Sequence, residues 1–465
     1  MKNLKRIWAE KYKIVPDQLK KVALIPSVAT GFNANIDAIL KISGKKLKAL
    51  INENSLTLND VENIQISSFS ADTDVIRGIV KCFTRGIAEE WITDDINIYK
   101  WMEKHLGYNR LQMGGQGGII ANALALLGVQ KVITHTNSHP KLQAEQFLDL
   151  DNLLGFDENG KLCKAKDIRR DSDIPLVHWI IEFDKDDSFV LDGKEFKCPK
   201  SNRFIATYDP LNMKLVMNDG FITYINENKI SYLLLSGFHA LIEKNDGVNL
   251  VKNSVSVIKR WKKNNPDMIV HLEIASTQDK AVRKAIIQYI APLCESVGLN
   301  ERETIDLLES YGQVELAKKI ESDTHSSNLF EAIWFLKKQL KVKRIQLHMF
   351  GLYLTIQDKN IKISPEQSLN GMITAAIVSS SKALNGELVK YEDLTKSLGT
   401  EVSSQGLTEL SLLADILKCQ DLLEKGICDF ENCQIIAVPT ILIDKPKTLV
   451  GMGDTISSVS LLASM

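Results

Sequence analysis

Short apolar runs recur along the chain, each followed by turn residues and then by a segment with helical spacing of its apolar positions. The runs lie at 22–30, 232–237, 268–275, 344–348 and 433–440, and the helical segments include 246–263, 279–290, 301–312 and 328–340. The first three runs are nearly continuous, which is typical of strands covered on both faces. The alternation of strand and helix predicts an α/β fold with a central, mostly parallel sheet flanked by helices.

Two regions depart from this pattern. Residues 41–110 mix helical and polar stretches, whereas residues 176–230 alternate apolar and polar positions, with Asp-Gly pairs at 192–193 and 219–220 that favour hairpin turns. We therefore expect a smaller α/β lid domain with antiparallel strands. The expected division assigns 1–36, 111–175 and 231–465 to a large, discontinuous catalytic domain, and 37–110 and 176–230 to the lid.

Composition narrows the class of protein. The 465 residues are 44% apolar, and 57 basic against 58 acidic side chains give a formal charge of −1, so nothing favours a nucleic-acid partner. The apolar runs near 22–30 and 434–443 are too short to span a bilayer, and no apolar segment follows the charged N-terminus. The seven cysteines form no Cys-x-x-Cys pair. We expect a cytoplasmic protein with reduced thiols and no membrane partner; a monomer is favoured and a homodimer is left open.

A glycine-rich motif near the C-terminus carries candidate chemistry. Gly451-Met452-Gly453-Asp454-Thr455 precedes a helical pattern at 456–464. The glycines let successive backbone N–H groups point at one spot, and a helix N-terminus favours an anion. Asp454 would then accept a hydroxyl proton as a general base while the amides stabilise a transferred phosphoryl group. The alternative is a plain turn in which Asp454 or Thr455 caps the helix.

Two further segments suit a neutral polyol. In Gly31-Phe32-Asn33-Ala34-Asn35-Ile36-Asp37-Ala38, Asn35 and Asp37 would share one side of an extended chain and reach two neighbouring hydroxyls. In Met113-Gly114-Gly115-Gln116-Gly117-Gly118, the glycines expose backbone N–H groups before a helix, and Gln116 can donate and accept. An Asx-rich turn and a glycine turn made for close packing are the respective alternatives.

Two short acidic motifs suggest a divalent metal. His271-Leu272-Glu273 would place His271 and Glu273 on one side of a strand, and Asn300-Glu301-Arg302-Glu303 would place Asn300 and Glu303 on one side of a helical turn. Carboxylates that hold Mg²⁺ through water fit this arrangement. For the second motif the alternative is a helix start in which Asn300 is the N-cap and Glu303 completes a capping box.

Together these separated motifs, spread from Gly31 to Ser458, resemble the ADP-dependent sugar kinases, the glucokinase and phosphofructokinase group of the ribokinase-like superfamily. The resemblance implies a ribokinase-like large domain and a lid that contributes to sugar binding. It also implies transfer of the β-phosphoryl group of Mg-ADP to a sugar, giving AMP, in a modified glycolysis. The implied roles are base for Asp454; anion hole for Gly451, Met452 and Gly453; sugar contacts for Asn35, Asp37, Glu90, Gly115 and Gln116; metal binding for His271, Glu273, Asn300 and Glu303; and adenine binding near His348, Val438 and Pro439.

The choice of sugar depends on a few charged residues. By the resemblance, Glu89 occupies the position where a carboxylate favours glucose, because it accepts hydroxyl hydrogen bonds and repels a sugar phosphate. Lys185 and Arg203 are candidates for holding the 6-phosphate of fructose 6-phosphate. Glu89 with such an Arg predicts a bifunctional enzyme that accepts both sugars. A solvated helical pair is the alternative interpretation of Glu89 and Glu90.

Two other functions remain open at this point. An ATP-dependent ribokinase-type kinase of a sugar or nucleoside would keep Asp454 and the parallel sheet, and a non-catalytic sugar-binding regulatory protein would keep the scaffold. The chain has neither a Walker A motif nor a protein-kinase glycine loop. The expectation of ADP as donor comes from the resemblance.

Overall fold

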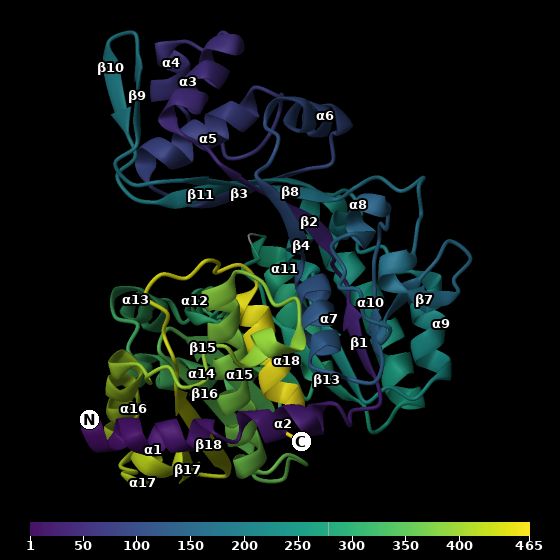
Figure 1. Ribbon diagram of the computed structural model, residues 1–465, viewed down its shortest axis with the longest axis vertical. Coiled ribbons are helices and arrows are strands. Elements are labelled where there is room, and N and C mark those ends of the chain that lie inside the picture. The colour runs from purple at the N-terminus through teal and green to yellow at the C-terminus, as the bar shows by residue number, and fades with distance from the viewer. Residues whose placement is uncertain (278) are drawn as a thin grey trace.

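The computed structural model describes residues 1–277 and 279–465, and its main element is an eleven-stranded sheet (Figure 1). Seven neighbouring strands, from β15 to β6, run parallel, and the strands at both edges are antiparallel. This arrangement confirms the expected α/β class with a mostly parallel central sheet. The strand order is β17 (Ile427–Phe430), β18 (Cys433–Pro439), β16 (Leu352–Asp358), β15 (Arg344–Met349), β14 (Ser296–Leu299), β13 (Ile269–Glu273), β12 (Tyr232–Leu235), β1 (Val28–Gly31), β5 (Val132–Thr134), β6 (Leu153–Phe156) and β7 (Leu162–Lys164).

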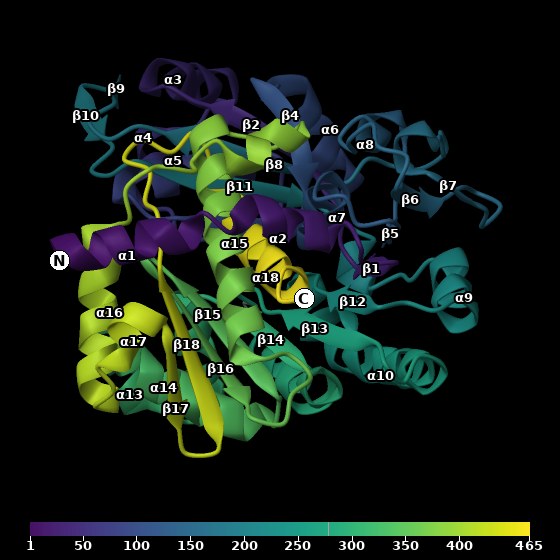
Figure 2. The same ribbon diagram turned by 60° about the horizontal axis from the view of Figure 1, so that its bottom comes forward.

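Helices cover both faces of this sheet, which explains why β1 and β12 are buried along their whole length. On one face, α15 and α18 lie side by side (Figure 2). That face carries α1 (Lys2–Tyr12), α2 (Val15–Val22), α7 (Gln116–Leu126), α15 (Pro365–Asn385) and α18 (Met452–Leu462). The other carries α9 (Asp219–Glu227), α10 (Gly247–Asn264), α11 (Lys280–Ala285), α12 (Glu301–Ser310), α13 (Val314–Ser322), α14 (Ser326–Leu340) and α16 (Ser404–Leu417), while α17 (Asp421–Lys425) lies near β17.

A smaller five-stranded sheet forms the lid and lies over the carboxyl ends of the parallel strands (Figure 1). The lid is mixed rather than purely antiparallel, because β3 runs parallel to β11 and β2 runs parallel to β8. Its strand order is β3 (Glu89–Thr93), β11 (Asn202–Tyr208), β8 (Val177–Phe183), β2 (Asn35–Lys41) and β4 (Arg110–Gly114). Its outer face is covered by α3 (Gly44–Glu53), α4 (Leu58–Glu62), α5 (Asp74–Arg85) and α6 (Ile96–His105), beside the hairpin of β9 (Ser188–Leu191) and β10 (Lys194–Lys197); the short α8 (Lys141–Ala144) lies near β2.

Each sheet has its own apolar core. The lid core joins strand residues such as Trp91 and Phe204 to the outer helices, and the large core includes Phe221 and Ile225 of α9. α9 precedes residue 231 but packs on the large core. The residue limits expected for the two domains stay a prediction.

Three local expectations were wrong in detail. The run at 22–30 divides into the end of α2 and a β1 that begins at Val28, because Pro26 lacks a backbone donor. The Asp-Gly pair at 192–193 turns the β9–β10 hairpin as predicted, but the pair at 219–220 opens α9, where the side chain of Asn218 accepts from Phe221 N. The last helix begins at Met452 rather than 456, so Asp454 lies within its first turn. In the described part of the chain, no helix combines the length and apolar character needed to cross a membrane.

Candidate active site

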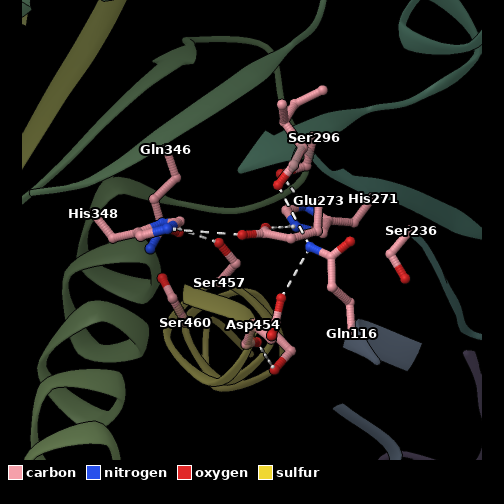
Figure 3. Close-up of polar contacts among 12 residues, drawn as sticks. Gln116, Ser236, His271, Glu273, Ser296, Gln346, His348, Asp454, Ser457 and Ser460 are labelled. Atoms are coloured by element: carbon pink, nitrogen blue, oxygen red, sulfur yellow. Dashed lines mark hydrogen bonds and ion pairs between the residues drawn. The ribbon is translucent and has the colours of Figure 1, made fainter. Parts of the chain in front are cut away.

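Asp454 lies in the first turn of α18 (Figure 3), and the lid sheet lies above this helix (Figure 1). Gly451 precedes the helix with φ +63°, a left-handed conformation that glycine adopts without a Cβ penalty. Within the described residues no side chain caps α18, since the Thr455 hydroxyl donates to Gly451 O at 2.8 Å instead. The first N–H groups of the helix therefore remain available to an anion.

Gln116 connects this carboxylate to the glycine-rich loop at the start of α7. Its Nε2 donates to Asp454 Oδ1 at 3.0 Å (Figure 3). Burial raises the pKa of Asp454, while the Gln116 hydrogen bond and the positive charges of Lys382 and His239 act in the opposite direction. A carboxyl with a raised pKa that still has groups favouring its ionised form suits general-base chemistry.

The glycine-rich loop is pressed against β2. A Cβ at Gly114 would lie 2.0 Å from Asp37 Oδ1, and one at Gly115 would lie 2.6 Å from Asn35 Oδ1. Gly117 N donates to Asn33 Oδ1 at 3.3 Å. The loop therefore serves close packing, and the same packing brings Gln116 beside the polar residues of β2.

Polar side chains gather on the inner face of the lid. Asn35 Nδ2 donates to Asp37 Oδ1 at 3.0 Å, and burial raises the pKa of Asp37 to about 6. Cross-strand partners share a sheet face, so the register places Asp37, His178 and Thr207 in one row. The Thr207 hydroxyl donates to Glu90 Oε1 at 2.7 Å. This face offers several acceptors and donors to a bound polyol.

Glu89 and Glu90 point to opposite faces of β3, since successive strand residues alternate. Glu89 Oε1 lies 2.8 Å from Lys81 Nζ of α5, and Glu89 Oε2 accepts from Trp91 Nε1 at 2.8 Å. The interpretation of the pair as a solvated helical face is wrong. The structure places Glu90 on the same face as Asp37 and turns Glu89 toward the lid helices; the glucose contact expected for Glu89 stays a prediction.

The two candidate phosphate ligands are both exposed. Arg203 pairs in register with Glu182, so it lies on the same inner face as Thr207. It precedes Thr207 by four residues in β11. Lys185 lies in the loop after β8, where its backbone N–H donates to Ser201 Oγ at 2.8 Å. Arg203 thus lies near the start of β11, on the face of the lid sheet that is turned toward the large domain.

The strand motif around Glu273 is buried next to Asp454 and the segment 451–455, which we call the catalytic loop after its expected role (Figure 3). Glu273 Oε2 lies 3.2 Å from His271 Nε2, and Glu273 Oε1 lies 3.8 Å from His348 Nε2. Burial, with the nearby negative charges of Asp454 and Glu303, raises the pKa of Glu273 well above its ordinary value. The residues around Glu273 therefore supply too little positive charge to stabilise its ionised form.

Asn300 and Glu303 form the capping box that was the alternative interpretation. Asn300 Oδ1 accepts from Glu303 N at 3.0 Å, and Glu303 Oε2 accepts from Asn300 N at 2.8 Å. Burial nevertheless raises the pKa of Glu303 to about 8. Glu303, Glu273 and Gln116 line one small pocket.

The chemistry of this pair of carboxylates suits Mg²⁺, which takes oxygen ligands. In the part of the chain that the structure describes, no group of three or more His, Cys, Asp or Glu side chains is arranged as a metal site. Two buried carboxylates that lack a compensating charge match a cation that keeps most of its waters. Glu273 and Glu303 are the residues that would hold it; the metal role expected for His271, Glu273, Asn300 and Glu303 stays a prediction.

The residues expected near adenine lie in one row of the large sheet. His348 pairs with Tyr353, and Tyr353 pairs with Val438, next to Pro439. All are buried, and burial lowers the pKa of His348 to about 4. A Cβ at Gly453 would lie 2.7 Å from His348 Nε2, so this histidine supports the catalytic loop. The segment also presents Phe350, which is 62% exposed.

Several site residues escaped the sequence analysis. His178 bonds Asp209 Oδ2 at 3.1 Å beside Asp37, and His239 extends toward the lid from the loop after β12. Nothing in their sequence context marks either histidine. Lys382 contacts the catalytic loop, and its signal was a single charge in an otherwise small and apolar helical stretch, 371–384.

Comparison with known proteins matches this chain over nearly its whole length. The "ADP-specific Phosphofructokinase/Glucokinase conserved region" matches residues 26–463. The ADP-dependent glucose/glucosamine kinase of Pyrococcus furiosus is 31% identical, with 97% of both chains covered. The ADP-specific phosphofructokinase of Methanosarcina acetivorans is 28% identical, covering 93% of this chain and 92% of that one. A solved ADP-dependent kinase in complex with fructose-6-phosphate and ADPbetaS superposes with a TM-score of 0.84 at 29% identity, covering 98% and 97% of the two chains.

The parallel sheet, the lid and the anion-ready N-terminus of α18 define a sugar kinase of the ADP-dependent class. The chain belongs to the ADP-specific phosphofructokinase/glucokinase family.

Proposed function

We propose that this protein transfers the β-phosphoryl group of ADP to a sugar hydroxyl, giving AMP and a phosphorylated sugar. The hydrogen bond between Gln116 and Asp454 supports the proposal most directly, because it joins a buried carboxylate in the first turn of α18 to the loop that packs against the lid strand β2. The sugar would lie between Asp37 and Asp454. Asp454 would accept the proton of the attacking hydroxyl, whose oxygen forms the new bond to phosphorus as the bond to AMP breaks.

The backbone of the catalytic loop would stabilise the transferred group. The N–H groups of Met452 and Gly453 belong to the first turn of α18, and the helix adds partial positive charge there. Glu273 and Glu303 would hold Mg²⁺, which when bound would supply positive charge for the phosphate oxygens. Closure of the lid would exclude water from the cleft.

The sugar range is proposed to include both glucose and fructose 6-phosphate. Glu90 and Asp37 supply acceptors for hydroxyls on the inner face of the lid, and Arg203 supplies a guanidinium on the same face for a 6-phosphate. Relatives of both activities match more than nine-tenths of the chain. Because Glu89 points to the lid helices, Glu90 is the carboxylate that would contact the sugar hydroxyls.

A donor and acceptor panel tests the proposal. Initial rates would be measured for Mg-ADP and Mg-ATP with glucose, glucosamine and fructose 6-phosphate, following AMP or ADP release. We expect AMP with glucose and with fructose 6-phosphate, and much slower turnover of ATP. Turnover of a single sugar would contradict the dual specificity; turnover with ATP alone would contradict the donor.

A further inference from the structure

We propose that Lys382 is a positioning residue, whose ammonium group fixes the orientation of the peptide that opens the anion-binding loop. The inference rests on the proposed phosphoryl transfer and deepens it. Lys382 lies near the C-terminal end of α15, which packs against α18 (Figure 2).

The contacts of Lys382 converge on the first residues of the loop. Its Nζ donates to Gly451 O at 3.0 Å and to Thr455 Oγ1 at 3.2 Å. The Thr455 hydroxyl donates to the same Gly451 carbonyl at 2.8 Å. The backbone N–H of Thr455 also donates to this oxygen, at 3.2 Å. Three donors therefore hold one carbonyl oxygen at the start of α18, and Lys382 is the one that comes from another helix.

The direction of this carbonyl determines the direction of a catalytic amide. The peptide bond is planar and trans, so the N–H of Met452 points opposite to the C=O of Gly451. When Lys382 draws the carbonyl toward α15, the Met452 N–H is turned the other way, out of the helix N-terminus. Fixing the donor before reaction is what an anion hole requires.

The contact between Lys382 and the loop requires a glycine at position 451. A Cβ at Gly451 would lie 2.9 Å from Lys382 Nζ and 2.7 Å from Ile119 Cδ1. A larger residue at Gly451 would displace the ammonium. The absence of that side chain lets the ammonium approach the backbone.

Removing the Lys382 ammonium from water costs free energy. A side chain that served only to fill space would not need this charge. The neighbouring residues of α15 are small or apolar and mostly buried, and burial lowers the pKa of Lys382 to about 8 against the opposing charges of Asp454, Asp37 and Glu387. An apolar side chain would fill the same volume without desolvating a charge. The ammonium is therefore retained for its contacts with the loop.

The other side of Lys382 borders a pocket open to solvent, which Thr455 and Glu387 also line. Small cations can enter this pocket from solvent. A variant that shortens Lys382 should therefore accept an alkylammonium ion in place of the missing Nζ.

The test compares Lys382→Ala with Lys382→Met and the exposed control Lys338→Ala in steady-state assays. We expect kcat of Lys382→Ala to fall about 100-fold, as for a small misplacement of catalytic groups, with sugar KM within about twofold of wild type. Methylammonium or ethylammonium should restore kcat in a saturable way, whereas methanol should not. Lys382→Met fills the space, so it should show the same loss without rescue.

Thermal unfolding of each variant identifies loss of folding, and Lys382→Met keeps the test valid if Lys382→Ala is unstable. Wild-type kcat in either folded variant, or a loss in Lys382→Ala that no ammonium ion restores, would overturn the inference while leaving the proposed function intact. A wild-type protein that forms no AMP would contradict the proposed function, and the role of Lys382 with it.

Discussion

Gln116 Nε2 and Asp454 Oδ1 are joined by a 3.0 Å hydrogen bond across 338 residues of sequence. The bond ties the loop that contacts β2 to the carboxylate that would deprotonate the sugar. A donor aimed at a buried carboxylate favours its ionised form. The proposed sugar site and the proposed base are therefore linked through one amide.

Replacement of Gln116 by Leu should lower activity through the base. Loss of a hydrogen bond to a charged group costs about 1.5–3 kcal/mol, which corresponds to about a 10- to 150-fold fall in kcat. The pKa of Asp454 should rise further, so the acidic limb of the kcat profile should move to higher pH. Gln130→Leu, at an exposed position, is the control; equal pH profiles for wild type and Gln116→Leu would refute the coupling.

Stability of the substrate-free protein should depend on the ionisation of Asp37. Burial raises its pKa from 3.8 to about 6. Below about pH 4 the carboxyl is protonated in both states; as the pH rises toward 6 the unfolded chain loses the proton first, so the free energy of unfolding falls. Asp37→Asn should therefore gain stability relative to wild type across this interval, on the order of 3 kcal/mol for a shift of about two units. Denaturant unfolding at several pH values checks this, and a pH-independent difference would contradict it.

Substitution of Glu89 should affect mainly the stability of the protein, whereas substitution of Glu90 should affect mainly its activity toward sugars. Glu89→Gln removes the carboxylate charge opposite Lys81, a nearly buried lysine, and should lower the free energy of unfolding by about 1–3 kcal/mol with little change in sugar KM. Glu90→Gln should instead reduce kcat/KM for sugars. Calorimetry with steady-state kinetics on both variants distinguishes them; a glucose-specific KM defect in Glu89→Gln alone would restore the role expected from sequence.

The sequence predicted those features that depend on residues close together in the chain. Gly451 and Gly453 before a helical pattern were enough to predict an anion site, because backbone conformation and a helix N-terminus are local properties. The capping box of Asn300 and Glu303 was likewise visible as an alternative, since both partners lie within one turn. Strand–helix alternation was enough for the fold class.

Long-range placement was not accessible in the same way. Whether Glu89 or Glu90 faces the sugar depends on the pairing of β3 with β11, and a shift of one residue exchanges the two faces. The contact of Lys382 with Gly451 depends on how α15 packs against α18, which no local pattern specifies. The short β14 and the antiparallel β16 were not among the predicted strands, because four to seven buried residues give little periodicity.

Arg203 should matter only for a phosphorylated sugar. Arg203→Ala should raise the KM for fructose 6-phosphate at least about tenfold, because a charge-assisted hydrogen bond to phosphate is lost, and should leave the KM for glucose unchanged. Arg260→Ala, an exposed arginine of α10, serves as the matched control. Parallel losses for both sugars in Arg203→Ala would argue for a structural role instead.

The most direct test of the central claim measures turnover and sugar binding in Asp454→Asn, with Asp444→Asn at an exposed loop position as control. Removal of the base should lower the rate of AMP formation from Mg-ADP by about 10²- to 10⁴-fold, while the sugar Kd from calorimetry stays within about threefold of wild type. Wild-type turnover in Asp454→Asn would contradict the assignment of Asp454 as the base.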